Sequence, residues 1–553
     1  MGNEYETKPI DPKSGFCTQT KIFHSLRLPV PLPHLSQPLS ITDYVLSLIP
    51  ATVSTTTFLV DSATDRRLSY SLFLHQVQTL ASSLQLLTPL SKGHVAFILS
   101  PASFDIPVLY FSLLSLGVTI SPANPLGSES EVAHQVGLSK PVIAFATSST
   151  AHKIPKLQFG TILIDSPQFL SMINGTGGID NRGVVRVEVS QSDSAVILYS
   201  SGTTGRVKGV LLTHRNLIAL IAGIYHQQHA YDLDGNHSDS VSLFILPLFH
   251  VFGFFMLIQA VSMGETLVLM ERFDFQAMLR AVEKYKVTDM PVSPPLIVAL
   301  AKSELVHKYD LSSLQFLGCG GAPLGKEVAE SFSAKYPKVE IVQGYGLTES
   351  GGAAARTLGP EESKQHGSVG RLAENMEAKI VDPSTGEALP PGQRGELWLR
   401  GPTIMKGYVG NDKATAETLD SEGWLKTGDL CYFDSDGCLY IVDRLKELIK
   451  YKAYQVPPAE LEHLLQTNPE IADAAVIPYP DEYAGEIPMA YVVRKTGSNI
   501  TAAQIIDFVA KQVAPYKKIR QVDFISSIPK SPAGKILRRE LVSHALSSRS
   551  SKL

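Results

Sequence analysis

The sequence predicts an α/β protein with a large N-terminal α/β part and a small C-terminal α+β part. The chain has 553 residues, which is too many for one compact core. Between residues 41 and 190, helix-like segments alternate with apolar strand-like runs, and this spacing favours βαβ units and a parallel sheet. Because the pattern changes near residue 444, we predict two domains, residues 1–443 and 444–553.

The composition is that of an ordinary globular protein. Hydrophobic residues make up 44% of the chain and charged residues 18%, which suits a large buried core. A formal net charge of -4 gives no electrostatic case for nucleic acid as a partner. The four cysteines are irregularly spaced and fit neither a disulfide framework nor a zinc site. The most apolar stretch, residues 243–270, is broken by Pro247 and Gly264, so we expect no membrane span.

The individual elements follow from apolar periodicity and from turn residues. Residues 1–40 are rich in proline and predict an extended surface arm. We expect no signal peptide in this segment. The large part is expected to contain helices at 41–49, 69–87, 214–227 and 275–286, and strands at 94–99, 118–121, 142–146, 161–164 and 195–199. A small β-subdomain is expected from 376 to 443, with strands at 378–381, 395–400 and 438–442. The C-terminal part is expected to contain helices at 457–466, 501–513 and from about 536, and strands at 473–478, 489–494 and 521–525.

The loop at residues 200–209 carries the most distinctive chemistry. It reads Ser-Ser-Gly-Thr-Thr-Gly-Arg-Val-Lys-Gly and follows the apolar run 195–199. Glycines let backbone N–H groups approach phosphate oxygens, while the hydroxyls and Lys208 add donors and charge. It is not a Walker A loop, because a glycine follows Lys208 and a strand comes before the helix that Thr213 would cap. The loop alone favours phosphate binding, and a flexible surface loop is the alternative.

Five motifs, taken together, resemble the adenylate-forming acyl-CoA synthetase superfamily. They occur in the family's order and are loop 200–209, Tyr345–Glu349, Thr427–Asp429, Asp443–Lys450 and Pro532–Lys535. Within that superfamily the sequence is most similar to the plant 4-coumarate–CoA ligase-like enzymes, on Gly344–Glu349 and Lys446–Gln455. The ending Ser551-Lys552-Leu553 is similar to that of peroxisomal members and is an address read by an import receptor.

The resemblance implies a ligase that runs two half-reactions. A carboxylate attacks the α-phosphate of ATP to give acyl-adenylate and pyrophosphate, and the thiol of coenzyme A then displaces AMP. It implies ATP, Mg²⁺ and coenzyme A as cofactors. It also implies that residues 1–443 hold the acyl and ATP sites, and that residues 444–553 form a mobile lid with the catalytic lysine.

The resemblance also assigns the nucleotide site. The residues expected to grip the β- and γ-phosphates are Ser200, Ser201, Gly202, Thr203, Thr204 and Lys208. Thr348 and Glu349 would hold the α-phosphate and Mg²⁺, since a hard cation prefers carboxylate and phosphate oxygens. An ordinary carboxylate at a helix N-terminus is the alternative for Glu349. The expected adenine and ribose contacts are Gln343, Gly344, Tyr345, which would stack on adenine, Asp429, which would accept both ribose hydroxyls, and Arg444.

Lys535 is the predicted catalytic residue. A lysine after Pro-Ala-Gly can reach the α-phosphate and carboxylate oxygens and stabilise the charge of the transition state. Lys450 and His250 are the other expected catalytic residues, and Lys446 is the expected hinge. The remaining assigned residues are Gln455, which would orient the adenylate or Lys450, Arg272 for the phosphate of coenzyme A, and Lys452 and Ala453 as further cofactor-binding residues. A solvated helix face is the alternative for the cluster of lysines between 446 and 452.

The acyl pocket departs from the pattern of hydroxycinnamate ligases. Phe252 stands where those enzymes tend to have tyrosine, and Gly321 where they tend to have alanine; Gly346 is assigned to the same pocket. Loss of a phenol and of a methyl group favours longer and more apolar carboxylates. We therefore expect a fatty acid or an oxylipin, such as a jasmonate precursor, bound for peroxisomal β-oxidation. The alternatives are a 4-coumarate or cinnamate ligase of phenylpropanoid metabolism and, more remotely, a luciferase-like oxygenase or an inactive acyl sensor.

Overall fold

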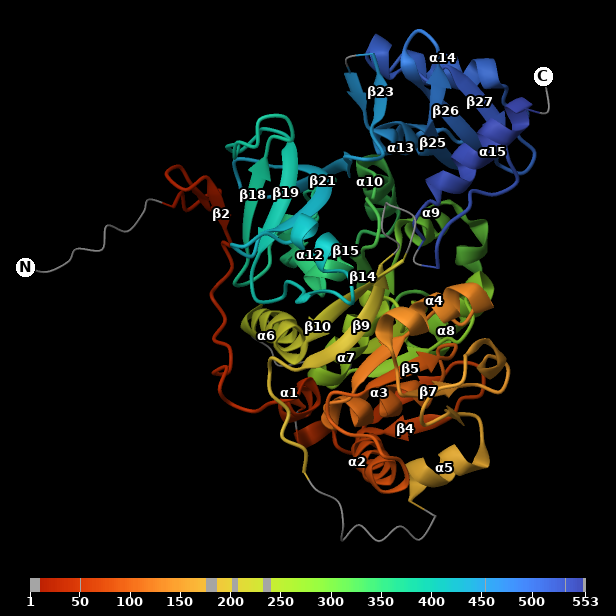
Figure 1. The fold of residues 1–553 in the computed structure, drawn as a ribbon. Helices are drawn as coiled ribbons and strands as arrows, with labels where there is room; N and C mark the ends of the chain where they lie inside the picture. The colour runs from red at the N-terminus through yellow and green to blue at the C-terminus, as the bar shows by residue number, and fades with distance from the viewer. Residues whose placement is uncertain are drawn as a thin grey trace, which may run out of the picture.

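The fold is seen in a computed structural model that describes most of the chain. The described residues are 10–49, 51–175, 186–200, 207–231, 240–452, 454–532 and 534–550. They form a mixed α/β fold with a large N-terminal part and a small C-terminal part standing on it (Figure 1). The predicted fold class is therefore confirmed.

A seven-stranded sheet, in the order β20-β10-β9-β6-β5-β7-β8, holds the strands that flank loop 200–209. Its strands are β5 (Val95–Leu99), β6 (Thr119–Pro122), β7 (Ile143–Ala146), β8 (Thr161–Leu163), β9 (Ser194–Ser200), β10 (Lys208–Thr213) and β20 (Gly407–Tyr408). The strands from β8 to β9 run parallel, as the βαβ pattern predicted, whereas β9, β10 and β20 pair antiparallel. The loop thus joins two neighbouring antiparallel strands.

A nine-stranded sheet, in the order β17-β16-β15-β14-β13-β11-β12-β3-β4, supplies most of the polar strand ends. Its strands are β3 (Thr57–Asp61), β4 (Arg67–Ser69), β11 (Val241–Phe244), β12 (Thr266–Leu269), β13 (Asp289–Val292), β14 (Phe316–Cys319), β15 (Glu340–Leu347), β16 (Gly352–Arg356) and β17 (Arg371–Leu372). The strands from β3 to β15 are parallel. Their carboxyl ends therefore lie along one edge, where α/β sheets bind ligands.

Helices cover these two sheets and fill the space between them (Figure 1). They are α1 (Ile41–Leu48), α2 (Tyr70–Leu87), α3 (Ile106–Ser115), α4 (Glu129–Ser139), α5 (Pro167–Asn174), α6 (His214–Tyr231), α7 (Val251–Met263), α8 (Phe275–Tyr285), α9 (Pro294–Lys302), α10 (Lys326–Lys335), α11 (Gly359–Ser363) and α12 (Asp412–Thr418). As predicted, Thr213 caps α6, since its Oγ1 accepts a hydrogen bond of 3.2 Å from the N–H of Asn216.

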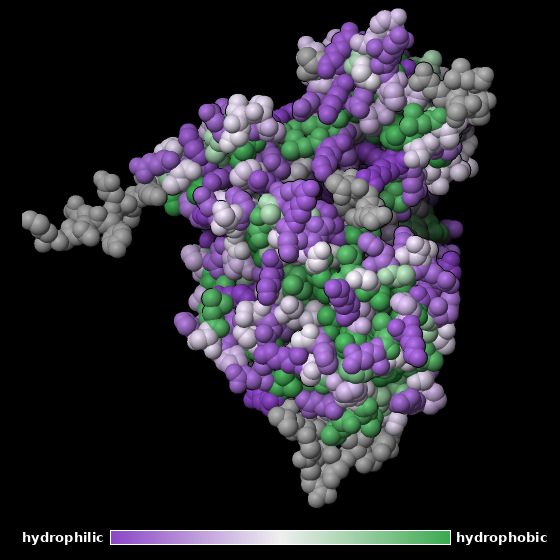
Figure 2. Space-filling model, viewed as in Figure 1, coloured by the Kyte–Doolittle hydropathy of each residue, from purple (hydrophilic) through white to green (hydrophobic). Residues whose placement is uncertain are grey.

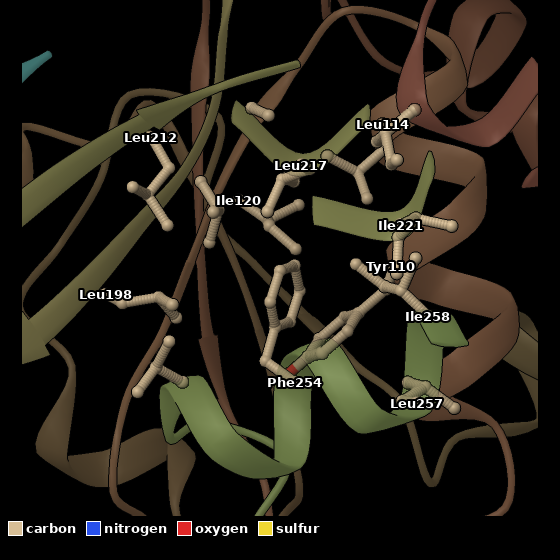
Figure 3. Close-up of a cluster of buried hydrophobic side chains, with 14 of the residues drawn as sticks. Tyr110, Leu114, Ile120, Leu198, Leu212, Leu217, Ile221, Phe254, Leu257 and Ile258 are labelled. Carbon is tan, nitrogen blue, oxygen red and sulfur yellow. The ribbon is translucent and has the colours of Figure 1, made fainter. Parts of the chain in front are cut away.

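The main core lies between the seven-stranded sheet and helices α3, α6 and α7. Figure 3 shows Tyr110 of α3 and Phe254 of α7 pointing towards Ile120 of β6 and Leu198 of β9. Helix α7 is buried on nearly every side, which explains the apolar stretch at 243–270. Within the described part of the chain, each helix is too short or too polar to span a membrane.

A six-stranded antiparallel sheet corrects the prediction for the N-terminal arm. It runs β1 (Phe16–Cys17), β2 (Ile22–His24), β18 (Glu377–Val381), β19 (Gly395–Arg400), β21 (Leu425–Phe433) and β22 (Leu439–Arg444). The arm was expected to be extended and to lie on the surface, yet β1 and β2 form a hairpin on β18. Phe23 is buried there against Phe433, with ring centroids 4.4 Å apart, so the hairpin exists because this distant sheet covers it.

The C-terminal part has its own sheet and core. Its strands are β23 (Ile449–Tyr451), β24 (Tyr454–Val456), β25 (Ile471–Asp481), β26 (Gly485–Arg494) and β27 (Gln521–Phe524), and its helices are α13 (Pro458–Thr467), α14 (Ala502–Ala510) and α15 (Arg538–Ser550). The expected elements are present, with ends that differ by a few residues. Strand β22 ends at Arg444 and β23 begins at Ile449, and we keep the boundary between residues 443 and 444 as a proposal.

Candidate active site

A cavity of about 390 Å³ lies where the C-terminal part meets the large part. The large part contributes α9, Gly321, residues 344–347 of β15 and Asp429 to its wall, and the C-terminal part contributes Lys535 and Arg538. Figure 2 shows the C-terminal part standing above the larger body, with hydrophilic and hydrophobic residues both present around the junction. The predicted nucleotide residues Gly344, Tyr345, Asp429 and Arg444 all line this cavity.

Asp429 lies on the cavity wall, where neighbouring side chains hold its carboxylate in place. It is 4% exposed, and it accepts a hydrogen bond of 2.6 Å at Oδ2 from the hydroxyl of Tyr345. Burial raises the pKa of its carboxyl, while the charge of Arg444 opposes that rise. Arg444 lies directly opposite Asp429 in the pairing of β21 with β22, and its Nε is 3.6 Å from Oδ1. A carboxylate fixed in this way suits the bidentate acceptance of two neighbouring hydroxyls.

The phosphate loop itself lies largely outside the described residues, because the structure does not describe 201–206. The expected contacts of Ser201, Gly202, Thr203 and Thr204 therefore stay predictions. The flanking residues Ser200 and Lys208 are direct partners in the β9–β10 pair. The ends of the loop are thus held together, as a phosphate-binding turn requires.

Glu349 lies beside these loop ends, in a short 3-10 turn formed by Thr348–Ser350. Its Oε1 accepts hydrogen bonds from Ser200 Oγ at 3.1 Å and from the hydroxyl of Tyr408 at 2.9 Å. Lys208 Nζ lies 4.5 Å above the ring of Tyr408, in a cation–π contact. Tyr408 was missed by the sequence analysis, because only the pairing of β20 with β10 brings it here.

These residues fit a magnesium ion that is shared with a phosphate. Glu349 supplies a carboxylate held by neutral hydroxyls, and Mg²⁺ binds through one or two carboxylates together with substrate phosphates and water. Among the described residues, no three His, Cys, Asp or Glu side chains are grouped to hold a metal ion by themselves. Glu349 would therefore hold the cation, which neutralises phosphate charge when it is bound, only together with the nucleotide.

Lys535 reaches the cavity from the C-terminal part on a tight loop. Its N–H donates to Ser531 Oγ at 3.2 Å, and its carbonyl accepts from the N–H of Ser531 at 2.7 Å. Gly534 has a φ of +80°, and a Cβ at this position would lie 2.8 Å from Oγ of Ser293 in the large part. Glycine is therefore required both by the turn and by the close approach of the two parts.

The charges around Lys535 pull its pKa in opposite directions. Burial lowers the pKa of Lys535 to about 8, and the neighbouring charge of Arg444 adds to this decrease. The carboxylates of Glu447 and Asp429 oppose it. Burial, together with the charge of Lys535, also lowers the pKa of His250 to about 4, so the imidazole is neutral near pH 7. A lysine in this setting is poised to gain an anionic partner.

The acyl residues lie at the start of α7 and at the neighbouring strand ends. Helix α7 begins at Val251 with His250 as its N-cap, whose Nδ1 accepts from the N–H of Phe252 at 3.3 Å. Phe252 stacks on Phe255 with ring centroids 5.7 Å apart, and a Cβ on Gly320 would lie 3.4 Å from its ring.

The two glycines assigned to the acyl pocket, Gly321 and Gly346, line the cavity between the parts, whereas neither His250 nor Phe252 is among its lining residues. Gly321 has a φ of +83°. A Cβ on Gly346 would lie 1.9 Å from the carbonyl oxygen of Gly352, so a side chain is excluded there. These positions therefore keep the floor of the cavity open.

Several predicted residues are not brought to the cavity. The exposed ones are Arg272, Lys446, Lys450, Lys452 and Gln455, and none of them lines it. Gln343 instead borders a second cavity of about 320 Å³, Thr348 is buried in the 3-10 turn, and Ala453 lies outside the described residues. Lys446, Lys450 and Lys452 are exposed, as the alternative of a solvated face expected, but Lys450 lies on strand β23 and not on a helix.

A buried charge cluster beside Lys535 was also missed. Arg538 pairs with both carboxylate oxygens of Glu462, at 2.5 and 2.9 Å, and its Nε lies 2.9 Å from Glu447. Burial raises the pKa of the nearby Asp443 to about 6, against the effect of Arg538. These partners are far apart in the sequence, so no local pattern signals them.

Comparisons with known proteins agree with this geometry. The chain matches the AMP-binding enzyme family over residues 50–409 and the C-terminal domain of AMP-binding enzymes over residues 460–535. It is 63% identical to 4-coumarate–CoA ligase-like 9 of Arabidopsis thaliana, over 99% of each chain. It is 46% identical to Peroxisomal OPC-8:0-CoA ligase 1 of the same plant, over 97% of this chain and 99% of that protein.

A solved structure shows the same architecture. The o-succinylbenzoate CoA synthetase of Bacillus subtilis, in complex with its acyl-adenylate intermediate, has a TM-score of 0.75 and 26% identity, and the match covers 90% of this chain and 97% of that chain. The chain belongs to the AMP-binding, adenylate-forming family, among the plant 4-coumarate–CoA ligase-like proteins. It is an ATP-dependent acyl-CoA ligase, an acid–thiol ligase that uses ATP, Mg²⁺ and coenzyme A.

The lowered pKa of Lys535 predicts an alkaline limb in the first half-reaction. If Lys535 stabilises the transition state as predicted, its protonated form is the active one, and kcat/KM for ATP should fall by about tenfold per pH unit above about pH 8. Bound ATP favours the protonated lysine, so the same limb should appear at higher pH in kcat. Pyrophosphate release, measured as a function of pH, checks both expectations.

The control for this profile is Lys535→Arg, whose guanidinium stays charged across the whole range. Its residual activity should show no alkaline limb. A kcat/KM for the natural enzyme that stays flat from about pH 7 to about pH 10 would contradict the assignment.

Proposed function

We propose that this ligase activates a medium- or long-chain fatty acid or an oxylipin carboxylate, such as a jasmonate precursor, for peroxisomal β-oxidation. The observation that carries the proposal is the apolar surrounding of Phe252. Its ring packs with Leu220, Ile224 and Phe255, and it carries no hydroxyl to pair with a phenolic substrate. A pocket of this kind does not select for a phenol, since such selection needs a polar partner in the site.

Two relatives support an aliphatic substrate. Peroxisomal OPC-8:0-CoA ligase 1, at 46% identity, bears the name of an acyl-CoA ligase of the peroxisome. A fatty acyl CoA synthetase of Mycobacterium tuberculosis shares 26% identity and a TM-score of 0.69. The second candidate substrate is 4-coumarate or a cinnamate, and the observation in its favour is the name of 4-coumarate–CoA ligase-like 9, at 63% identity.

We propose these roles for the residues of the site. Asp429 and Arg444 hold the ribose, and Glu349 holds Mg²⁺ against phosphates that loop 200–209 grips. Lys535 reaches the α-phosphate and the carboxylate of the acid, and stabilises the charge that develops between them. The C-terminal part then turns, and the cluster at Lys450, Lys452 and Gln455 serves the attack by coenzyme A.

The exposure of Lys450 supports that turn. Lys450 lies on β23 and outside the cavity, while Lys535 lines it. In this orientation Lys535 faces the cavity and Lys450 does not. If both are used, they are used one after the other.

Lys535→Ala should separate the two half-reactions. We expect it to lower acyl-adenylate formation by roughly 10²–10³-fold, because one preorganised charge is lost from the transition state. Thioester formation from supplied acyl-adenylate should change little. Pyrophosphate release and acyl-CoA formation measure the two steps, and an equal loss in both would contradict the division of roles.

Substrate preference can be measured as relative kcat/KM for AMP release that depends on coenzyme A. The panel is hydroxycinnamates, C6–C18 fatty acids and cyclopentenone acids, and the aliphatic acids should be preferred. Phe252→Tyr combined with Gly321→Ala should raise the ratio of 4-coumarate to fatty acid by roughly tenfold or more, because a hydroxyl partner returns. Tyrosine at the exposed Phe316 is the control. A clear preference of the unmodified enzyme for coumarate would refute the proposal.

The peroxisomal location rests on Ser551-Lys552-Leu553, which lie outside the described residues, and on the relative named as peroxisomal. A fluorescent fusion that leaves Leu553 as the free C-terminus should enter peroxisomes in plant cells. The same fusion without these three residues should remain outside. Equal distribution of the two fusions would show that the tripeptide is not the address.

A further inference from the structure

Helix α9 contacts the C-terminal part at both of its ends. Ser293, just before its first residue, lies against Gly534 of the loop that carries Lys535. At the other end, Lys302 is the last residue of the helix, and its Nζ donates to the carbonyls of Gln466 at 3.0 Å and of Ile471 at 3.3 Å. One helix of about 13 Å thus connects the reacting lysine with a second attachment point.

Lys302 bonds to groups that favour a positive charge. Gln466 is in the last turn of α13, where carbonyls have no partner within the helix and the helix dipole is negative. Ile471 begins β25, so the two accepting carbonyls come from adjacent elements of the C-terminal part. Lys302 therefore holds α13 and β25 together as one body against α9.

The surroundings of Lys302 strengthen its hydrogen bonds but still allow them to break. The side chain is partly buried, and burial with the charge of Lys495 lowers its pKa, while Asp473 opposes that change. Asp473 is itself paired with Lys530 at 2.6 Å. A hydrogen bond from a charged donor, shielded from water, contributes more than a surface bond.

The other contacts nearby combine packing with hydrogen bonding, because the ring of His463 is hydrogen-bonded to the backbone of Pro323 in the large part. Helix α10 packs on α13, and a Cβ on Gly325 would lie 3.1 Å from the ring of His463. Close packing of this kind prevents steric overlap, but it gives the two parts of the protein little directional attraction across a junction that solvent can enter. The charged bonds of Lys302 supply a directional attraction there.

We propose that Lys302 is a positioning residue, which holds the C-terminal part in the orientation that places Lys535 in the cavity. The inference rests on the proposed division of the half-reactions between the two faces of that part. Lys302 lies on the wall of the same cavity, and in this role it acts through the orientation of the C-terminal part. Its loss weakens the docked orientation, and so it slows only the step that needs Lys535.

The chain offers a matched control at the same helix end. Lys335 of α10 donates from Nζ to the carbonyl of Ala301 at 3.1 Å, one residue before Lys302. Both bonds join a lysine ammonium to backbone carbonyls at the end of a helix. The bond of Lys335 stays within the large part, whereas the bonds of Lys302 cross to the C-terminal part.

The experiment compares Lys302→Met, Lys302→Arg and Lys335→Met in the full-length enzyme. Lys302→Met should lower acyl-adenylate formation roughly tenfold and leave thioester formation from supplied acyl-adenylate unchanged or faster. Lys302→Arg should restore most of the loss, since it keeps the donor and the charge. Lys335→Met should leave the ratio of the two rates unchanged.

Hydrogen exchange gives a readout that is independent of activity. The peptide that holds Ser531 and Lys535 should exchange faster in Lys302→Met than in Lys335→Met, at equal thermal stability. Unchanged adenylate formation, or equal losses in both half-reactions, would overturn the inference. If Lys535→Ala fails to separate the half-reactions, the proposed function fails first; if it separates them and Lys302→Met does not, only this inference fails.

Discussion

The burial of one ammonium group at the junction of the two parts constrains the rest of the site. Removing Lys535 from water disfavours its charged form, and its pKa falls to about 8 although Glu447 and Asp429 are near. The neighbouring carboxylates thus do not fully offset the cost of burying the positive charge of Lys535. A bound anionic phosphate would supply the negative charge that is missing around Lys535. The same burial that lowers the pKa of Lys535 in the free enzyme would therefore favour the binding of ATP.

The arrangement of strands explains why these charges can meet. Strand β15 ends at the junction and supplies Tyr345, while the β21–β22 pair sets Asp429 opposite Arg444. The C-terminal part adds Lys535 on a loop that only glycine at 534 allows to approach Ser293. Tyr345 lies on one sheet, Asp429 and Arg444 lie on a second sheet, and Lys535 lies on a loop of the C-terminal part, so the position of Lys535 relative to the others depends on how the two parts dock. The site is therefore as sensitive to domain orientation as to any side chain.

Local sequence patterns were enough to predict the fold class, most elements and several residues that line the cavity, whose part in nucleotide binding stays a prediction. Asp429 and Lys535 both line the cavity, and a motif could point to them because it fixes both the residue and its turn. Local patterns did not point to Tyr408, Arg538 or Lys302, since these residues meet their partners only through the pairing and packing of distant strands and helices. The N-terminal hairpin was not predicted for the same reason, because the sheet on which Phe23 is buried is formed by residues beyond position 370.

The junction has to be firm and yet reversible if one small part serves two steps. A junction built like a protein core would bury much apolar area and hold one orientation too strongly. Here the cavity wall mixes glycines and charged groups, and Lys302 adds charged hydrogen bonds worth about 1.5–3 kcal/mol. Such an energy biases an equilibrium between two orientations by roughly ten- to a hundredfold, which is enough to populate the docked state and small enough to break. The attachment has to be weak because the C-terminal part must be able to turn between the two half-reactions.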